Sequence, residues 1–388
     1  MKKKVYLSIN GIGYGHATRN LLLIKELLKR GYSVYISTYN EGYEFLKKYF
    51  KNIYLSAGFN LIFTEEGILS LKLTLAKQFF SSIIKLFLQI ITEMRNLIHI
   101  NPNYIIVDSR ISTAVAARLL RMKFVLILNQ FYLDIPRIKK MNKLIKFLKR
   151  ISERILYEIL FTMWIYASYL IIPDLKPPYT ICSYSIKLKD KQYLHKLKFV
   201  GNIIHNQRIV KNKKISEKIC CTVILSGNLQ ERSIMFKSLL KIIKKIKNED
   251  IYINILTGLN FIKKTRINSA VIYGWIKDEE KSYLINEADI LIVNGGHSTL
   301  IETLQYKKPY LILLLKGHTE KFNNSRKIKE LGIGEYIFID ELNEIIFLNK
   351  IKEMYENKER YDNNIKNILK YLNNDIGFIL DLVYYDSR

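Results

Sequence analysis

Cysteine is scarce in this sequence, with three residues in 388. None has the spacing of a metal site, and two of them, Cys220 and Cys221, are adjacent. The six histidines do not have metal-ligand spacing either. We therefore expect reduced cysteines packed in the core of a cytosolic protein, and no bound metal.

Long hydrophobic runs are missing as well. The nearest candidate for a membrane span, residues 155–172, contains Glu158 and is followed by Pro173. At the N-terminus, three lysines precede an apolar stretch, 5–10, that is too short for the core of a signal peptide. The sequence predicts neither a spanning helix nor an export signal.

Acidic residues are few relative to basic ones. The 35 aspartates and glutamates are outnumbered by 62 lysines and arginines, which gives a formal net charge of +27. A surface this basic favours anionic partners such as nucleic acid, an anionic bilayer or a phosphorylated substrate. Nucleic acid is the weakest of these and is not expected as a partner, because the sequence has no recognisable nucleic-acid-binding module and no interleaving of aromatic and basic residues.

The residues that are abundant indicate two α/β domains. Apolar residues make up 49% of the chain, a globular value, and 388 residues suffice for two cores. Short apolar runs alternate with helical patterns in both halves, which predicts two doubly wound domains on parallel sheets. We place the first domain at 1–203, a lysine-rich linker at 204–218 and the second domain at 219–388. The strands expected from these runs are 5–9, 34–38, 104–107, 124–128, 169–172, 222–225, 252–256, 271–273 and 290–293.

A glycine-rich loop, 10–16, follows the first expected strand. Its glycines suggest a dinucleotide-binding fingerprint, but they alternate, and His16 stands where the third glycine is required. The acidic residue needed at the end of the second strand is also missing. A nicotinamide-dependent enzyme is therefore not expected.

The most informative stretch is Asn-Gly-Gly-His-Ser-Thr at 294–299, directly after the apolar run 290–293. Two adjacent glycines between a strand and a helix let the backbone turn sharply and present its N–H groups. Ser298 and Thr299 supply a cap and hydroxyl donors at the positive end of the helix. The pattern predicts a phosphate cradle, with Glu302 one turn further on to grip a diol such as a ribose. The alternative is an ordinary capped helix after a buried strand.

The downstream sequence favours the phosphate interpretation. A second apolar run, 310–315, is followed by a loop that reaches Glu320 and by Leu-Gly-Ile-Gly at 331–334. The ordered run 294–334 resembles the sugar-nucleotide-binding motif of GT-B glycosyltransferases of the family 28 C-terminal type. That group includes the lipid II-forming GlcNAc transferase, the eukaryotic pair that adds GlcNAc to a dolichol-linked sugar, and archaeal relatives. The family usually has glutamine after the acidic residue, whereas this chain has Lys321.

The resemblance implies a GT-B fold, in which two Rossmann-like domains face a cleft and the last helix, here 376–385, crosses back to the first domain. It implies a UDP-sugar substrate and no cofactor or metal, because helix dipoles and side chains stabilise the leaving pyrophosphate. A loop at 225–232 then approaches the phosphates, although Arg232 is alternatively a solvated helix residue, and 273–278 lines the base, although Trp275 is alternatively core. The donor-binding residues implied are Ser226, Gly227, Arg232, Ile276, Gly295, Gly296, His297, Ser298, Thr299, Glu302 and Glu320.

The loop that contains Gly13, Gly15, His16 and Arg19 is similar to the acceptor-side loop of the same family, whose equivalent histidine is needed for transfer. An acceptor hydroxyl must lose its proton as it attacks the anomeric carbon, and an imidazole can take that proton. We therefore expect His16 to be the catalytic base, the alternative being a histidine that only caps the helix or orients the loop. Asp108, after strand 104–107, orients the base or binds an acceptor hydroxyl, or is a helix cap.

The segment 138–165 is basic and amphipathic. One helical face carries Leu144, Leu148, Ile151, Ile155 and Ile159, and the others carry Lys139, Lys140, Lys143, Lys146, Lys149, Arg150 and Arg154. Such a helix suits an anionic membrane surface. The alternative is a core-facing helix with a lysine-rich solvated side.

Together these features predict an inverting glycosyltransferase that moves a sugar, GlcNAc by resemblance, from a UDP-sugar to a polyprenyl- or dolichyl-diphosphate-linked saccharide. We expect it in the cytoplasm, bound peripherally to the cytosolic face of the membrane. Alternatives are transfer to diacylglycerol or to a soluble acceptor, and an inert membrane-associated binding subunit. The presence of both His16 and Glu302 in one chain disfavours the inert subunit. The sequence leaves the oligomeric state open.

Overall fold

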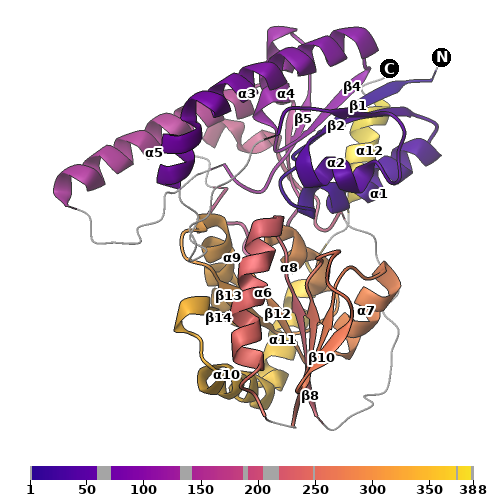
Figure 1. Ribbon diagram of the computed structural model, residues 1–388. Helices are drawn as coiled ribbons and strands as arrows, with labels where there is room; N and C mark the ends of the chain where they lie inside the picture. The colour runs from indigo at the N-terminus through magenta and orange to yellow at the C-terminus, as the bar shows by residue number, and fades with distance from the viewer. Residues whose placement is uncertain are drawn as a thin grey trace. The chain divides into compact units, whose positions relative to one another are not determined.

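The computed structural model describes residues 2–58, 71–131, 142–186, 191–203, 218–247, 250–372 and 375–385. Most of the linker predicted at 204–218 lies outside these ranges, as do Lys139 and Lys140. The chain divides into two compact units, labelled by their elements in Figure 1. Of the described residues, unit 2 takes 218–247 and 250–372, and unit 1 takes all the others, including 375–385 at the C-terminus.

Unit 1 is built on a seven-stranded parallel sheet in the order β3-β2-β1-β4-β5-β6-β7. Its strands are β1 Lys4–Ile9, β2 Ser33–Thr38, β3 Ile53–Leu55, β4 Tyr104–Asp108, β5 Val125–Ile127, β6 Tyr169–Ile172 and β7 Leu197–Phe199. Its helices are α1 Gly15–Lys29, α2 Asn40–Leu46, α3 Leu71–Ile100, α4 Ile111–Leu119, α5 Lys143–Trp164, the 3₁₀ helix η1 Lys191–Lys196, and α12 Ile376–Tyr385.

Helices cover both faces of the sheet of unit 1, which explains why its inner strands β4, β5 and β6 are apolar along almost their whole length. Along β1, Val5 and Leu7 pack into one core with α1 and α12, whereas Tyr6 points into the opposite core with α3 and α4. The C-terminal helix α12 contributes Ile379, Leu380 and Val383 to the first of these cores. Residues 376–385 are thus part of the hydrophobic core of unit 1.

Unit 2 repeats the architecture with the strand order β10-β11-β9-β8-β12-β13-β14, in which only β10, among the described strands, is antiparallel to its neighbour. Its strands are β8 Ile219–Ile224, β9 Ile251–Leu256, β10 Thr265–Ile267, β11 Ala270–Tyr273, β12 Ile290–Val293, β13 Tyr310–Leu314 and β14 Gly334–Phe338. Its helices are α6 Leu229–Ile243, α7 Asp278–Glu287, α8 His297–Leu304, α9 Thr319–Glu330, the 3₁₀ helix η2 Ile339–Glu341, α10 Glu344–Glu356 and α11 Lys358–Leu369. The predicted fold class, two doubly wound parallel-sheet domains, is confirmed.

The strand order fixes where a ligand is expected in each unit. In doubly wound sheets ligands bind beyond the carboxyl ends of the strands, at the point where the order reverses. In unit 1 that point lies between β1 and β4, and in unit 2 it lies between β8 and β12. The loops predicted from sequence to bind acceptor and donor follow these same strands.

The described helices include none that is long and apolar enough to cross a bilayer. The segment that came nearest in the sequence, 155–172, is split between the end of α5 and the buried strand β6. Several of its apolar residues, namely Leu160, Trp164, Leu170 and Ile172, are therefore used in the core of unit 1.

Candidate functional site

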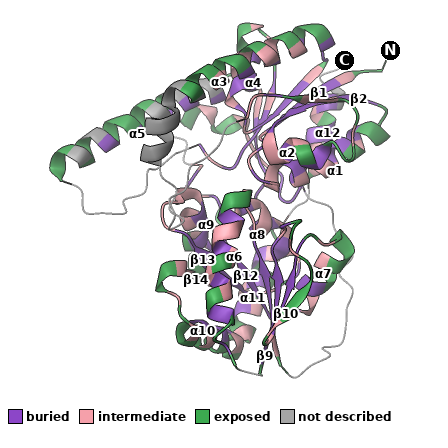
Figure 2. Cartoon of the chain, in the orientation of Figure 1, coloured by how far each residue is buried: buried purple, intermediate pink, exposed green. Residues whose placement is uncertain are grey.

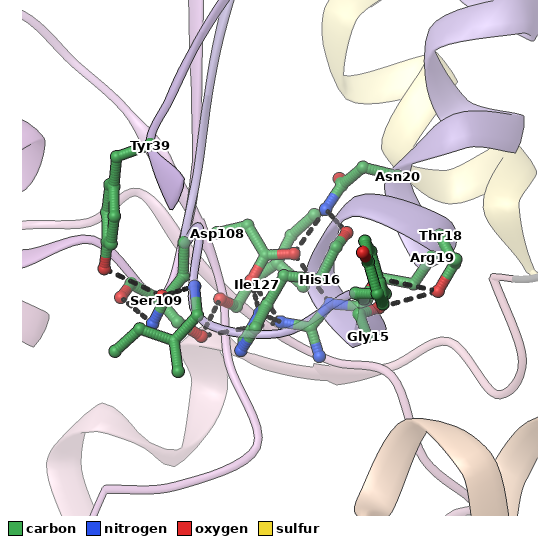
Figure 3. Close-up of polar contacts among 12 residues, drawn as sticks. Gly15, His16, Thr18, Arg19, Asn20, Tyr39, Asp108, Ser109 and Ile127 are labelled. Carbon is green, nitrogen blue, oxygen red and sulfur yellow. Dashed lines mark hydrogen bonds and ion pairs between the residues drawn. The ribbon is translucent and has the colours of Figure 1, made fainter. Parts of the chain in front are cut away.

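In unit 1, a cluster of polar side chains forms around Asp108 at the end of β4 (Figure 3). The Asp108 carboxylate is fully buried and accepts hydrogen bonds from His16, Arg19 and Asn20 of α1. His16 Nδ1 lies 2.8 Å from Oδ1, and Arg19 Nε lies 2.6 Å from Oδ2. The three helix residues reach one carboxylate because positions i, i+3 and i+4 share a helical face.

The charge of Asp108 is stabilised by these neighbours. Burial by itself raises the pKa of a carboxyl, because the ionised form loses its water. The Arg19 guanidinium and the His16 imidazole, by charge and by hydrogen bonding, outweigh burial and hold the pKa of Asp108 well below its usual range. Asp108 is therefore an anion at neutral pH.

An ionised Asp108 determines which nitrogen of His16 is basic. His16 Nδ1 lies 2.8 Å from Asp108 Oδ1 and 3.0 Å from Arg19 Nη2. Because a carboxylate only accepts, contact with Asp108 favours the tautomer with the proton on Nδ1, which directs Nε2 to a substrate. The His16 side chain is 22% exposed, whereas the Arg19 and Asp108 side chains are 3% and 0% exposed. The arrangement can take a proton from a hydroxyl at Nε2, with the carboxylate stabilising the imidazolium that forms.

Helix α1 begins at Gly15, two residues earlier than its apolar pattern indicates, so His16 lies in the first turn. The N-cap is Tyr14, and no side chain caps the helix there. His16 therefore does not act as a cap but bonds to Asp108. Gly13 precedes the helix with φ 68°, and its N–H donates to Glu41 Oε2 at 3.4 Å.

In unit 2, the loops after β8 and β12 are joined by hydrogen bonds. Asn294, the first residue after β12, accepts from Ser226 Oγ at 2.5 Å and donates to the Ser226 carbonyl at 2.6 Å. A β-carbon on Gly296 would lie 3.0 Å from Ser226 Oγ, so the two loops are in contact. Ser226, Gly295 and Gly296 are therefore brought together at the reversal of strand order.

Two of the predicted glycines are required by their surroundings. Gly227 has φ +104°, and a β-carbon there would lie 2.1 Å from Glu231 Oε2. Gly295 has φ +75°, and a β-carbon there would lie 3.0 Å from the carbonyl oxygen of Lys321. Any larger residue would separate these loops from the starts of α6 and α9.

Helix α8 begins at His297, with Gly296 as its N-cap and no side-chain cap. The prediction that Ser298 caps this helix is therefore wrong, because the helix starts before it and places Ser298 and Thr299 in the first turn. The first backbone N–H groups of a helix have no intrahelical acceptor. A glycine cap leaves them to an anion, which fits the predicted cradle. His297 itself is 3% exposed.

Glu302, predicted to bind the ribose, lies one turn into α8 and pairs with Lys281 of α7. The Lys281 ammonium is 2.6 Å from Glu302 Oε1, and the two side chains are 27% and 18% exposed. Burial lowers the pKa of Lys281, but the Glu302 carboxylate outweighs burial and raises it. The carboxylate is thus oriented by Lys281 and remains partly accessible.

The structure decides between the alternatives for Arg232 and Trp275. Arg232 is buried, and its Nη1 donates to the carbonyl of Gly258 after β9, so it is not a solvated helix residue. Trp275 is 45% exposed and is not a core residue. Ile276 follows it and is half-buried, and Glu320 is the second residue of α9.

Several residues of these clusters were not among the predicted site residues. The role of Asn20 could have been predicted, since it follows His16 by four residues on one helical face. The role of Asn294 could also have been predicted, because it is the first polar residue after a buried strand in the stretch 294–299. No sequence pattern indicates Lys281 or Glu231, because their partners are distant in the sequence.

Comparison with known families agrees with this geometry. Residues 3–166 match the model described as glycosyl transferase family 1, and residues 230–374 match the glycosyltransferase family 28 C-terminal domain. The second match covers the anion cradle of unit 2.

Individual glycosyltransferases are also similar to this chain in sequence or in structure. An uncharacterized glycosyltransferase of Methanosarcina mazei is 26% identical over 92% of each chain. The UDP-N-acetylglucosamine–N-acetylmuramyl-(pentapeptide) pyrophosphoryl-undecaprenol N-acetylglucosamine transferase of Clostridium tetani is 26% identical over 51% of this chain and 58% of its own. The crystal structure of Acinetobacter baumannii MurG has the same fold, with a TM-score of 0.62 over 99% of each chain at 13% identity. The chain therefore has the GT-B fold and is similar to glycosyltransferases over most of its length, and residues 230–374 match the family 28 C-terminal domain.

Proposed function

We propose that this protein is an inverting glycosyltransferase that moves GlcNAc from UDP-GlcNAc to a saccharide linked to a polyprenyl or dolichyl diphosphate. It acts at the cytosolic face of the membrane, to which it binds peripherally. The observation that carries the proposal is the pairing of His16 with Asp108 at the reversal point of unit 1, together with an anion cradle at that of unit 2.

His16 acts as the base. Its Nε2 takes the proton of the acceptor hydroxyl while the hydroxyl oxygen attacks the anomeric carbon. The bond from that carbon to the UDP oxygen breaks, and UDP leaves with the bonding electrons. A single displacement of this kind inverts the anomeric configuration. Asp108 holds the imidazole and stabilises its protonated form.

The donor binds to unit 2 through its diphosphate. Helix N-termini with unsatisfied N–H groups, such as that of α8, favour a phosphate. The name of the Clostridium tetani relative supports UDP-GlcNAc as the donor. We further propose that transfer needs no metal, so that activity persists in EDTA; mass spectrometry of the products from a panel of UDP-sugars identifies the sugar.

The membrane proposal rests on the first half of α5, which extends away from the sheet of unit 1 (Figures 1 and 2). Its exposed apolar side chains follow one another at helical spacing; they are Leu144, Phe147, Ile151 and Ile155, with exposures of 64%, 60%, 40% and 55%. The exposed basic side chains beside them are Lys143, Lys146, Arg150 and Arg154. A stripe of this kind can enter the headgroup region while the charges contact anionic lipid.

Lys149 does not belong to this surface. It is buried and pairs with Glu153 at 3.1 Å, one turn along α5. The prediction that Lys149 lies on the exposed basic face is therefore wrong, since Glu153 already balances its charge inside unit 1. Leu148 and Ile159 are not among the residues whose side chains the structure describes.

A second exposed apolar stripe lies on α3. It consists of Ile84, Phe87, Leu88 and Ile91, which are 59%, 61%, 51% and 46% exposed. Clusters of large exposed apolar side chains mark interaction surfaces in soluble proteins. The stripe is a candidate for contact with the bilayer or with the lipid chain of the acceptor.

We expect the triple variant Lys143→Glu/Lys146→Glu/Arg150→Glu to lose binding to anionic liposomes. Each basic residue near an anionic leaflet contributes about 1 kcal/mol, so loss of three lowers the partition coefficient roughly a hundredfold. Cosedimentation over a range of salt concentrations measures this, and the wild type should bind less as salt rises.

The matched control reverses three exposed lysines of unit 1 outside α5, namely Lys48, Lys51 and Lys123. It changes the net charge equally and should keep most of the liposome binding. Equal losses in both variants would mean that net charge, and not α5, brings the protein to the membrane.

Glu302→Ala is expected to lower UDP affinity on the order of tenfold or more, since a hydrogen bond to a charged group contributes about 1.5–3 kcal/mol. If the carboxylate binds the ribose diol, the wild type should prefer UDP to 2′-deoxy-UDP, and the variant should not. Calorimetry with both ligands measures the preference. The control is Glu335→Ala, which removes a carboxylate of the same unit that also pairs with a lysine and is 19% exposed. A variant that still discriminates between them would place the ribose elsewhere.

The overall proposal is tested by comparing two acceptors. A membrane-anchored acceptor is concentrated on the surface where the enzyme sits, so transfer from UDP-GlcNAc to a GlcNAc-diphosphate-lipid should have a much higher kcat/KM than transfer to the same sugar without lipid. The assay is run with anionic liposomes present. Equal rates would favour a soluble acceptor, and transfer to diacylglycerol alone would favour a glycolipid synthase.

A further inference from the structure

A buried ion pair lies beneath the anion cradle of unit 2. Glu231, in the first turn of α6, pairs with Lys321, in the first turn of α9. Their side chains are only 4% and 7% exposed. Removing two charges from water costs several kcal/mol per ion, so a pair in this position needs a reason beyond stability.

The pair touches both glycine loops of the cradle. A β-carbon on Gly227 would lie 2.1 Å from Glu231 Oε2 and 3.4 Å from Lys321 Nζ. A β-carbon on Gly295 would lie 3.0 Å from the carbonyl oxygen of Lys321, and Asn294 Nδ2 lies 3.5 Å from Glu231 Oε1. The Lys321 ammonium therefore lies directly against the Gly227 loop, which is expected to approach the donor phosphates.

The ammonium of Lys321 has more N–H donors than its described partner accepts. It carries three N–H groups, and among the described residues Glu231 is its one hydrogen-bond partner. With the side chain so little exposed, water satisfies the other two poorly. An anion in the cradle would give them acceptors.

The sequence points to the same position. The resemblance implies a neutral glutamine after the acidic residue of this motif, and this chain has a cation instead. Lys321 is directed toward Glu231 and Gly227, whose loop is expected to approach the donor phosphates. The substitution thus places a positive charge where the leaving group gathers negative charge.

We propose that Lys321 is the cation that binds the donor diphosphate and stabilises it as it leaves, and that Glu231 is the positioning residue that aims it. This inference rests on the proposed nucleotide-sugar donor. Glu231 accepts a hydrogen bond from the ammonium, and in the donor complex the ammonium is shared between Glu231 and a phosphate oxygen. Charge placed in advance where charge develops is effective in transition-state stabilisation.

The test is the double variant Glu231→Gln/Lys321→Gln. It leaves the net charge unchanged and replaces the ion pair by two amides that can hydrogen-bond to each other. The matched control is Lys329→Gln/Glu335→Gln, which removes an exposed pair with a 2.8 Å separation between α9 and β14. Calorimetry measures the binding of UDP and of uridine to both variants and to the wild type, with melting curves to verify folding.

We expect the Glu231→Gln/Lys321→Gln variant to bind UDP about tenfold or more weakly, with uridine binding unchanged, and the control to bind both like the wild type. Lys321→Arg keeps the cation and should recover most of the UDP affinity even if the double variant folds poorly. Three results would each overturn the inference: unchanged UDP affinity in the double variant, equal losses of affinity for UDP and uridine, or a Lys321→Arg variant that binds UDP as weakly as the double variant. The ion pair would then have a structural role only. A wild type that binds no UDP would instead refute the proposed donor.

Discussion

His16→Ala is expected to lower kcat by about 10²–10⁴, the usual contribution of general base catalysis. Its imidazole is held by Asp108 through Nδ1 and is partly exposed. Nε2 is therefore the nitrogen that can take the proton of the acceptor's hydroxyl group. UDP affinity should remain unchanged, because the donor loops belong to unit 2. Steady-state kinetics and calorimetry on the same preparation separate the two effects.

The matched control is His195→Ala. His195 is an exposed histidine of the same unit, in η1, whose ring bonds to the carbonyl of Gln192. It should leave kcat within about twofold of the wild type, as surface substitutions usually do. A His16→Ala enzyme with near-normal turnover would exclude His16 as the base.

Asp108→Asn is expected to lower kcat to a similar degree, by about 10²–10⁴. An amide in place of the carboxylate no longer stabilises an imidazolium, and its N–H₂ group can favour the wrong tautomer of His16. The variant should also be less stable by about 3–5 kcal/mol, because Arg19, with its side chain 3% exposed, loses its counterion. Turnover is therefore measured well below the melting temperature of the variant.

Glu93→Gln is the control for stability. Glu93 forms another buried ion pair of unit 1, with Arg110 at 3.0 Å, and its described hydrogen-bond partners do not include His16. A comparable loss of stability is expected without a comparable fall in kcat. If both variants lost activity in proportion to stability, Asp108 would be a structural residue only.

The pH dependence of stability distinguishes the Asp108 variant further. The pKa of Asp108 is lower in the folded protein than in the unfolded chain. Its contribution is therefore present above the unfolded value of about 4 and is lost as the pH falls toward the folded value. The free energy of unfolding, measured with urea at a series of pH values from neutral to acid, should fall less steeply with decreasing pH for Asp108→Asn than for the wild type.

The central strands could be predicted from sequence because they are buried on both faces. Tyr169–Ile172 and Ile290–Val293 were expected with the bounds that the structure has. The edge strands β3 and β10 were not predicted, since each is only three residues long and its residues are half-exposed or exposed. The start of α1 was placed too late, because Gly15 and His16 contribute nothing to the apolar pattern of that helix.

The amphipathic segment shows the limit of periodicity. The exposed apolar stripe of α5 was expected in part, with Leu144, Ile151 and Ile155 on it. Phe147 joins that stripe, and Lys149 leaves the basic face to pair with Glu153 inside the unit. Helical spacing tells which residues share a face, but packing against other elements decides which face is exposed.

By itself the sequence determined the order of strands and helices and the places where glycine loops and a histidine follow buried strands. These features depend on the residues of one short segment, whose periodicity and turn chemistry are local. Only the tertiary structure decided which side chains meet: it chose contact with His16 among the roles left open for Asp108, 92 residues away, and it paired Glu231 with Lys321 across 90 residues. Such pairs follow from the register of parallel strands, which brings distant carboxyl ends to one edge of a sheet, and no local pattern records it.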